Sequence, residues 1–148
     1  SLDMSASGPV QNDGDGKNLL SRLQAMELSV LQARLALLIT SVAIFGLALL
    51  PAHFESPTLF GADKIKHMGA FVVLTLLARA SWPFWPLWRL ALGLAAFGAA
   101  IELAQGLSGL GRTASFADLV ADLIGIGLSF ALLWGVRKLR AKKHTTVA

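Results

Sequence analysis

The chain has 148 residues, which is room for one compact unit rather than two. Hydrophobic residues make up 55% of it and the mean hydropathy is +0.63, whereas a soluble domain is about 45–50% apolar. This excess predicts a protein embedded in a lipid bilayer. The absence of cysteine excludes disulfides and thiolate metal sites. The net charge of +4 indicates basic loops beside anionic lipids, and no binding to nucleic acid is expected.

The N-terminal part of the chain is polar and precedes the first long apolar run. Residues 1–17 are rich in Ser, Gly, Asp and Asn and are expected to form a disordered tail without a cleavable signal peptide. In residues 18–34, apolar side chains recur every three or four positions between Arg22, Gln24 and Glu27. This spacing predicts an amphipathic helix that lies on the inner membrane interface or leads into the first membrane span.

Residues 35–136 contain four apolar segments that are predicted to cross the membrane. A crossing helix needs roughly 20 residues, so the second segment, which Lys66 and His67 interrupt, is the weakest candidate unless it continues to Trp82. The predicted fold class is all-α: a polytopic membrane protein with a bundle of four transmembrane helices and an N-terminal amphipathic helix. The four segments are Leu35–Leu50, Ile65–Ala78, Leu90–Leu107 and Phe116–Val136.

The distribution of Lys and Arg predicts the orientation. Only Lys64, Lys66 and Arg112 of the 13 basic residues fall on one side, so the positive-inside rule places both ends of the chain in the cytoplasm, in a bacterial inner membrane. Residues 137–148 would then form a basic cytoplasmic tail beside anionic lipids. The four tryptophans fall at the same inner boundary, where amphipathic rings prefer to lie. They are Trp82, Trp85, Trp88 and Trp134.

Small residues recur every four positions in the last two segments, a pattern that lets membrane helices approach closely. For the third segment, ordinary membrane composition explains the pattern equally well. The two series are Ala91, Ala95 and Ala99, and Ala117, Ala121, Gly125 and Ser129.

Polar residues of three segments are predicted to meet in one layer near the outer surface, because ionisable groups in membrane helices usually face the bundle interior. Pairs three or four residues apart share a helix face. The second span opens with Asp63, Lys64 and His67, the third closes with Glu102 and Gln105, Arg112 follows in the loop, and Asp118 and Asp122 open the fourth.

Structural explanations compete with a functional one for most of these residues. Asp63 and Asp118 suit helix N-termini, and Lys64 and Lys66 suit a polar interface. His67 would be satisfied as a neutral ring bonded to Asp63 or to a backbone carbonyl. Glu102 and Asp122 lie deeper, where an unpaired charge costs several kcal/mol. Arg112 is their expected partner, either in a salt-bridge network that only fixes helix packing or in a binding site.

The ordered set of motifs between residues 63 and 127 resembles the VanZ-like family of membrane proteins. The resemblance implies a four-helix membrane fold and a role in the cell envelope related to glycopeptide resistance, but it implies no particular reaction. It also implies a functional cluster of His67, Glu102, Gln105, Arg112, Asp118 and Asp122, the last being more typically Asn in the family. The motifs are Asp63-Lys64-x-x-His67, Glu102-x-x-Gln105, Arg112, and Asp118-x-x-x-Asp122-x-x-Gly125.

Two functions are carried forward, and the sequence does not decide between them. In the first, the site binds a membrane lipid, a lipid-linked precursor or a glycan, with Arg112 and Lys64 at phosphate and the carboxylates and Gln105 at hydroxyls or amines. In the second, the protein is a membrane-embedded transferase or hydrolase acting on a lipid-linked or polyprenyl substrate. The catalytic candidates are then His67, Glu102, Arg112 and Asp118, and the substrate-binding candidates are Asp63, Lys64, Gln105 and Asp122.

Other functions and ligands are less favoured. A proton-coupled transporter is disfavoured because the inner halves of the spans lack matching acids. Four helices are also few for a transporter, unless the protein forms a homo-oligomer or associates with another membrane protein. His67, Glu102, Asp118 and Asp122 offer nitrogen and oxygen ligands, but no recognised metal spacing is present and no metal is expected. No cofactor can be named.

Overall fold

The computed structural model describes residues 13–50, 62–109 and 115–145, and these residues form four α-helices and no strand. The helices are α1 (Asp13–Ala48), α2 (Ala62–Ser81), α3 (Leu87–Leu107) and α4 (Phe116–Thr145). By length and composition, α1, α3 and α4 are long and apolar enough to cross a membrane, whereas α2 is not among these candidates. The predicted all-α class is therefore confirmed, with three candidate membrane helices among the described residues.

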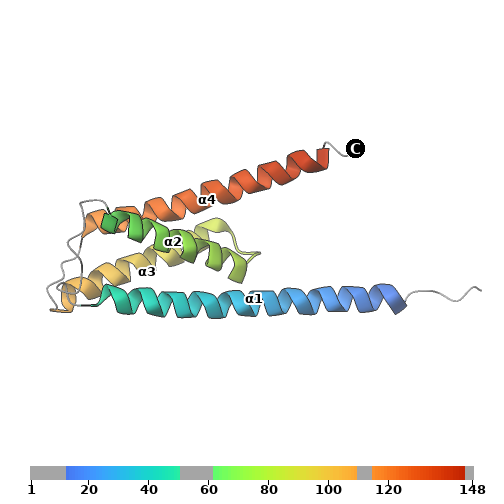
Figure 1. The fold of residues 1–148 in the computed structure, drawn as a ribbon, viewed down its shortest axis with the longest axis horizontal. Helices are drawn as coiled ribbons and strands as arrows, with labels where there is room; N and C mark the ends of the chain where they lie inside the picture. Colours follow the sequence, from blue (N-terminus) through green and yellow to red (C-terminus); the bar gives the residue numbers. More distant parts are fainter. Residues whose placement is uncertain (1–12, 51–61, 110–114, 146–148) are drawn as a thin grey trace, which may run out of the picture.

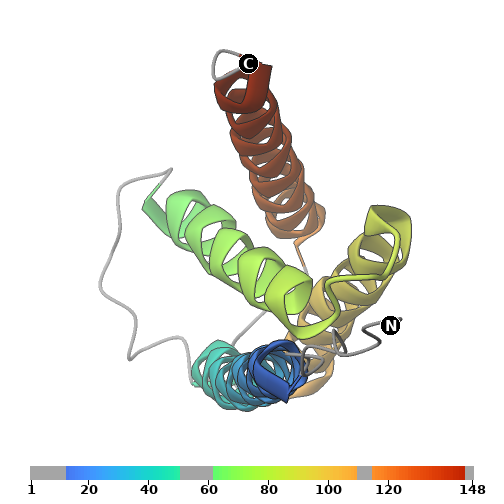
Figure 2. The same cartoon turned by 90° about the vertical axis from the view of Figure 1, so that its right-hand side faces the viewer.

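The helices run up and down along one long axis (Figure 1). The start of α1 and the end of α4 lie at the same end of the molecule, and the turn between α2 and α3 points toward that end but lies nearer the middle of the long axis. Seen along the axis, α2 lies between α1 and α4, with α3 alongside (Figure 2). The enclosed position of α2 explains why its core-facing side chains are almost fully buried: Phe71, Leu74, Thr75, Ala78 and Ser81.

The first helix is one continuous element that begins at Asp13. The predicted tail over residues 1–17 is therefore wrong for Asp13–Lys17, while residues 1–12 lie outside the described residues. The separate amphipathic helix over residues 18–34 is not confirmed, because this stretch continues without a break into the first apolar segment. No proline lies between Asp13 and Pro51, and the many Leu, Ala, Gln and Arg residues of 18–34 favour helix.

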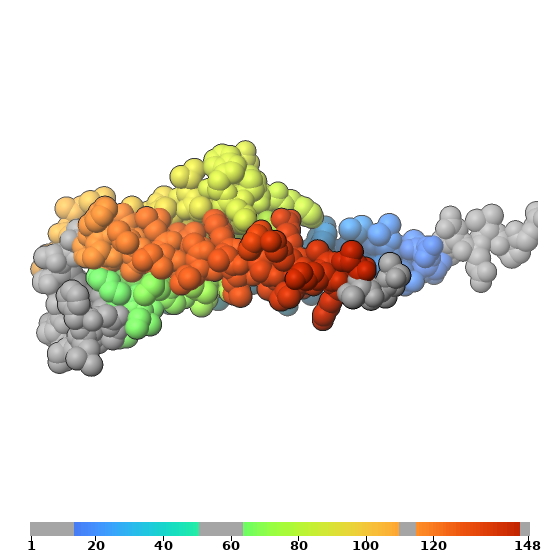
Figure 3. Space-filling view, turned by 90° about the horizontal axis from the view of Figure 1, so that it is seen from above, coloured from blue at the N-terminus to red at the C-terminus, as the bar shows by residue number. Residues whose placement is uncertain are grey.

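The last helix also extends further than the sequence predicted. α4 continues to Thr145, so most of the basic segment 137–148 is helical rather than a tail. Lys142, Lys143 and His144 lie in its last turn, where positive charge is favourable beside the helix dipole. Figure 3 shows that the C-terminal part of α4 and the N-terminal part of α1 extend beyond the rest of the bundle.

The contact between α2 and α4 is unusually close at Gly125. A Cβ atom at this position would lie 2.6 Å from the Met68 carbonyl oxygen and 3.1 Å from the Phe71 Cβ. Its neighbours in the predicted small-residue series, Ala121 and Ser129, are also buried, whereas Ala117 is exposed. The series in α4 therefore forms a helix interface. In α3, Ala91 and Ala95 are half-buried and Ala99 is exposed.

Candidate functional site

Five ionisable side chains from three helices gather at the end of the bundle opposite the chain termini. We call them the polar cluster: Lys64 and His67 from α2, Glu102 from α3, and Asp118 and Asp122 from α4. The sequence predicted all five as site residues. Of the other predicted site residues, Arg112 and the side chain of Asp63 lie outside the described residues, and Gln105 is treated below.

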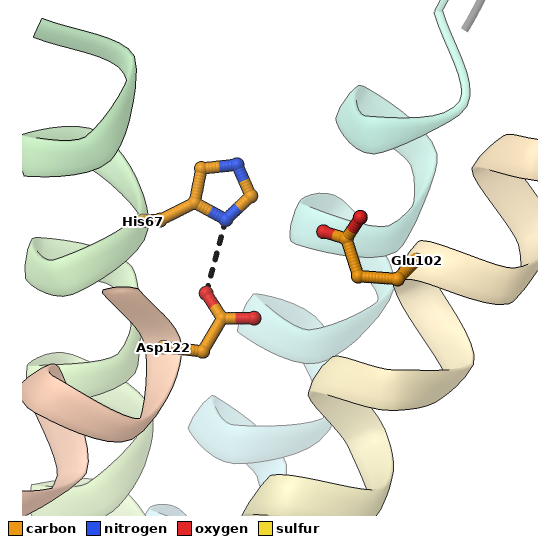
Figure 4. Close-up of side chains that lie close together, drawn as sticks. All are labelled: His67, Glu102 and Asp122. Atoms are coloured by element: carbon orange, nitrogen blue, oxygen red, sulfur yellow. Dashed lines mark hydrogen bonds and ion pairs between the residues drawn. The ribbon is translucent and has the colours of Figure 1, made fainter. Parts of the chain in front are cut away.

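His67 and Asp122 join α2 to α4 at the centre of the polar cluster. The Nδ1 atom of His67 lies 3.0 Å from Oδ1 of Asp122, whose side chain is 0% exposed (Figure 4). Nε2 of the same ring lies 3.9 Å from Oδ2 of Asp118. Among the described residues, the carboxylate that His67 contacts belongs to another helix, and the expected contact with the Asp63 side chain lies outside the described residues. A buried acid at Nδ1 fixes the orientation of the ring.

Lys64 and Asp118 form an ion pair between the starts of α2 and α4. Lys64 is therefore engaged within the bundle and does not simply extend to the interface, whereas Lys66 is exposed as expected. Asp118 lies in the first turn of α4, where a negative charge is favourable. Its backbone N–H donates to the Ser115 hydroxyl oxygen at 3.3 Å, so Ser115 caps this helix. The sequence analysis missed Ser115, although Ser-x-x-Asp before an apolar run is a capping signal.

Glu102 reaches the polar cluster from α3 with a carboxylate that is half satisfied. Its Oε2 accepts a hydrogen bond from the Ser115 backbone N–H at 2.8 Å. Its Oε1 is buried without a hydrogen-bond partner among the described residues, and the same holds for Oδ2 of Asp122. Figure 4 shows the Glu102 carboxylate facing His67 and Asp122. Because an unpaired buried charge costs several kcal/mol, these two oxygens would need a proton, a ligand or a group outside the described residues.

Gly98 makes room beside Asp122 and was also missed. A Cβ at Gly98 would lie 2.9 Å from Oδ2 of Asp122 and 3.2 Å from Cζ of Phe71. Gly98 lies one turn before Glu102 on the same face of α3, and this spacing was the available signal. The missing side chain therefore lets α3 approach the unpartnered oxygen of Asp122 closely.

Gln105 has a contact that explains its burial without any ligand. Its Nε2 donates to the backbone carbonyl of Ala48 at 3.0 Å, which satisfies a carbonyl at the end of α1. The amide thus ties α1 to α3 next to the polar cluster. Its predicted role in substrate binding stays a prediction.

The polar cluster has an excess of negative charge. Lys64 balances Asp118, which leaves Glu102 and Asp122 as two negative charges when both carboxylates are ionised and His67 is neutral. Potential ligand atoms of His67, Glu102 and Asp122 lie within 4.8 Å of one another. The arrangement suits a cation or a group that donates hydrogen bonds, and a phosphate would depend on Lys64 and on Arg112 outside the described residues.

Comparisons of the chain with protein-family models, with curated proteins and with solved structures found no match. The resemblance to VanZ-like proteins therefore depends on the motifs of the sequence alone.

Proposed function

We propose that this chain is a VanZ-like protein of a bacterial inner membrane in which all four helices cross the bilayer and both chain ends are cytoplasmic. Although α2 is not among the three candidate membrane helices, its 20 residues span about 30 Å, the thickness of the hydrocarbon core. Its charged residues also lie near its ends, with Lys64 and Lys66 at one and Arg79 at the other. The basic residues outside Lys64, Lys66 and Arg112 belong to the opposite end of the bundle.

Single cysteines test this topology cleanly, because the chain has none of its own. Lys66→Cys in α2 and Phe84→Cys in the turn before α3 place one thiol near each end of α2, at exposed positions. A membrane-impermeant maleimide is expected to label Lys66→Cys only from outside intact cells and Phe84→Cys only in inside-out vesicles. Labelling of both thiols from the same side would show that α2 does not cross.

The polar cluster is proposed to bind the polar head group of a cell-envelope lipid, a lipid-linked precursor or a glycan at the outer face. The observation that carries this proposal is the pair of buried carboxylate oxygens, on Glu102 and Asp122, that lack partners among the described residues. A network that served only helix packing would satisfy its own polar atoms, since buried polar groups are almost always hydrogen-bonded. Hydroxyl or amine groups of a head group would supply the missing donors, and Lys64 and Arg112 would meet a phosphate.

Binding is best measured with the full chain in nanodiscs. The probes are polyprenyl phosphate and a polyprenyl-diphosphate-linked disaccharide, with phosphatidylglycerol as the reference lipid. We expect Glu102→Gln and Lys64→Ala to weaken binding of a polyprenyl probe about tenfold or more, as for loss of a charge-assisted hydrogen bond. Glu27→Gln and Lys66→Ala remove the same charges at exposed positions and should have no effect. Equal binding by all four variants would reject the proposal.

A membrane-embedded transferase or hydrolase is the second candidate. It is favoured by the 3.0 Å contact between His67 Nδ1 and Asp122 Oδ1, because a carboxylate at one ring nitrogen orients a histidine for general base catalysis at the other. Release of phosphate or of glycan from the same polyprenyl probes tests this candidate. A catalytic His67 predicts that His67→Gln abolishes turnover while probe binding is retained, and probes that stay intact with the unaltered protein would reject an enzyme for these substrates.

A further inference from the structure

Three helices bring potential metal ligands to one point inside the bundle. His67 from α2, Glu102 from α3 and Asp122 from α4 each offer one ligand atom, and all three atoms lie within 4.8 Å of one another (Figure 4). Nitrogen and oxygen ligands lie about 2.0–2.2 Å from a zinc ion, so two ligands at a tetrahedral angle are about 3.3–3.6 Å apart. The separations of at most 4.8 Å would therefore have to shorten by up to about 1.2 Å on binding.

The unpartnered oxygens are an independent sign that this point receives a ligand. Glu102 is 6% exposed and Asp122 is 0% exposed, yet Oε1 of the first and Oδ2 of the second have no hydrogen-bond partner among the described residues. Gly98 lets α3 pack closely against Oδ2, because a Cβ there would lie only 2.9 Å from this oxygen. Buried polar groups are almost always hydrogen-bonded, so two such oxygens in one cluster point to a ligand.

The charge of the polar cluster indicates what the ligand is. With Asp118 paired to Lys64, two carboxylates remain beside a histidine, and a divalent cation would neutralise both. We propose that His67, Glu102 and Asp122 bind one divalent transition-metal ion between α2, α3 and α4. This proposal differs from the expectation from the sequence, which shows no metal spacing because each ligand comes from a different helix.

The ligand types narrow the choice of metal. Imidazole nitrogen with carboxylate oxygens suits zinc, manganese or iron, whereas magnesium and calcium prefer oxygen alone. Three protein ligands leave a coordination position for water or for another oxygen ligand. If the proposed function is right, a head-group phosphate would fill that position, and this last step alone rests on the proposed function.

The test uses the full chain in detergent, treated with a chelator and then supplied with zinc chloride or manganese chloride. We expect the protein to retain about one zinc ion per chain after desalting, measured by mass spectrometry of the eluted metal. Glu102→Gln and Asp122→Asn, which keep side-chain size, should bind zinc at least about tenfold more weakly. Glu27→Gln and His144→Ala, at exposed positions of α1 and α4, should retain it as before.

A second measurement needs no variant and so does not depend on whether a variant folds. Pulsed electron paramagnetic resonance of bound manganese should show coupling to one imidazole nitrogen, which is that of His67. Zinc retained equally by the two site variants, or manganese without nitrogen coupling, would overturn the proposal. Metal bound without any head-group binding would leave this site standing and reject the proposed function. Head-group binding that survives the chelator, in a protein that retains no zinc, would reject the metal site and leave the proposed function standing.

Discussion

Replacing Gly125 by alanine should separate α2 from α4 and disturb the polar cluster at the same time. The new Cβ would lie 2.6 Å from the Met68 carbonyl oxygen, whereas ordinary van der Waals contact begins at 3.4 Å. A backbone carbonyl within a helix cannot rotate aside, because it accepts the hydrogen bond of the next turn. The two helices must therefore move apart by about 0.8 Å, the difference between these two distances.

This movement has two energetic consequences. Overpacking of a close interface costs about 1–3 kcal/mol. His67 precedes Met68, and Asp122 lies one turn before Gly125, so the same movement would lengthen the 3.0 Å contact between His67 and Asp122 to about 3.8 Å. Loss of that buried hydrogen bond adds about 1 kcal/mol. We expect the free energy of unfolding to fall by about 2–4 kcal/mol in total.

Gly127→Ala is the matched control, because Gly127 lies in the same helix with nothing within 4 Å of its added Cβ. Unfolding by sodium dodecyl sulfate in mixed micelles, followed by circular dichroism, gives the free-energy difference between the two variants. Both substitutions change glycine to alanine within α4, so their intrinsic helix propensity is the same. Equal stability of the two variants, within about 0.5 kcal/mol, would refute the close contact between α2 and α4.

Three further predictions concern single contacts around the bundle. Gly98→Ala should crowd the unpartnered oxygen of Asp122 and reduce zinc retention. Gly93→Ala should not, because no atom lies within 4 Å of its added Cβ. Equal zinc retention by the two variants would contradict this prediction. Ser115→Ala should lower the free energy of unfolding by about 1 kcal/mol by removing the cap of α4, and Ser115→Thr should restore it. Arg34 donates a hydrogen bond to the Ser81 carbonyl at the end of α2 and lies over the Trp82 ring. Because Arg34 is exposed, Arg34→Ala should lower the free energy of unfolding by at most about 1 kcal/mol in the same assay. Arg22 makes neither of these contacts, so Arg22→Ala should lower the free energy of unfolding by less. An equal decrease for the two variants would contradict the contacts of Arg34.

The helices themselves were predictable from the sequence, but their lengths were not. The apolar runs, and the prolines that flank them, located the apolar part of each helix. The additional turns at Asp13–Lys17 in α1 and beyond Val136 in α4 are polar, and the sequence analysis assigned them to tails. Polarity distinguishes lipid from water but not helix from coil: beyond Val136, Lys and Arg favour helix almost as well as leucine does. The turn Asp13–Lys17 contains two Gly and two Asp, which are poor helix formers, so helix propensity does not explain it.

The topology of the chain was sufficient to predict that the residues of the polar cluster lie together, but not which of them contact each other. Helix direction and position along the chain were sufficient to bring His67, Glu102, Asp118 and Asp122 to the same end of the bundle. Which side chains touch depends on how each helix is rotated about its axis, and small residues at the contacts set that rotation. The pairing of His67 with Asp122 across two helices is of this kind. The roles of these residues in binding or catalysis stay predictions.

Two classes of buried polar residue can be separated by where their hydrogen bonds go. The hydroxyls of Thr75, Ser81 and Ser129 each donate to the carbonyl four residues earlier in their own helix, so they are satisfied wherever that helix lies. The carboxylates of Glu102 and Asp122 have no such local solution and keep unpartnered oxygens. Buried hydroxyls in the middle of the bundle therefore need no function to explain them. The two acids differ, because no donor among the described residues reaches these oxygens, and a proton, a ligand, a cation or a group outside the described residues has to offset their burial.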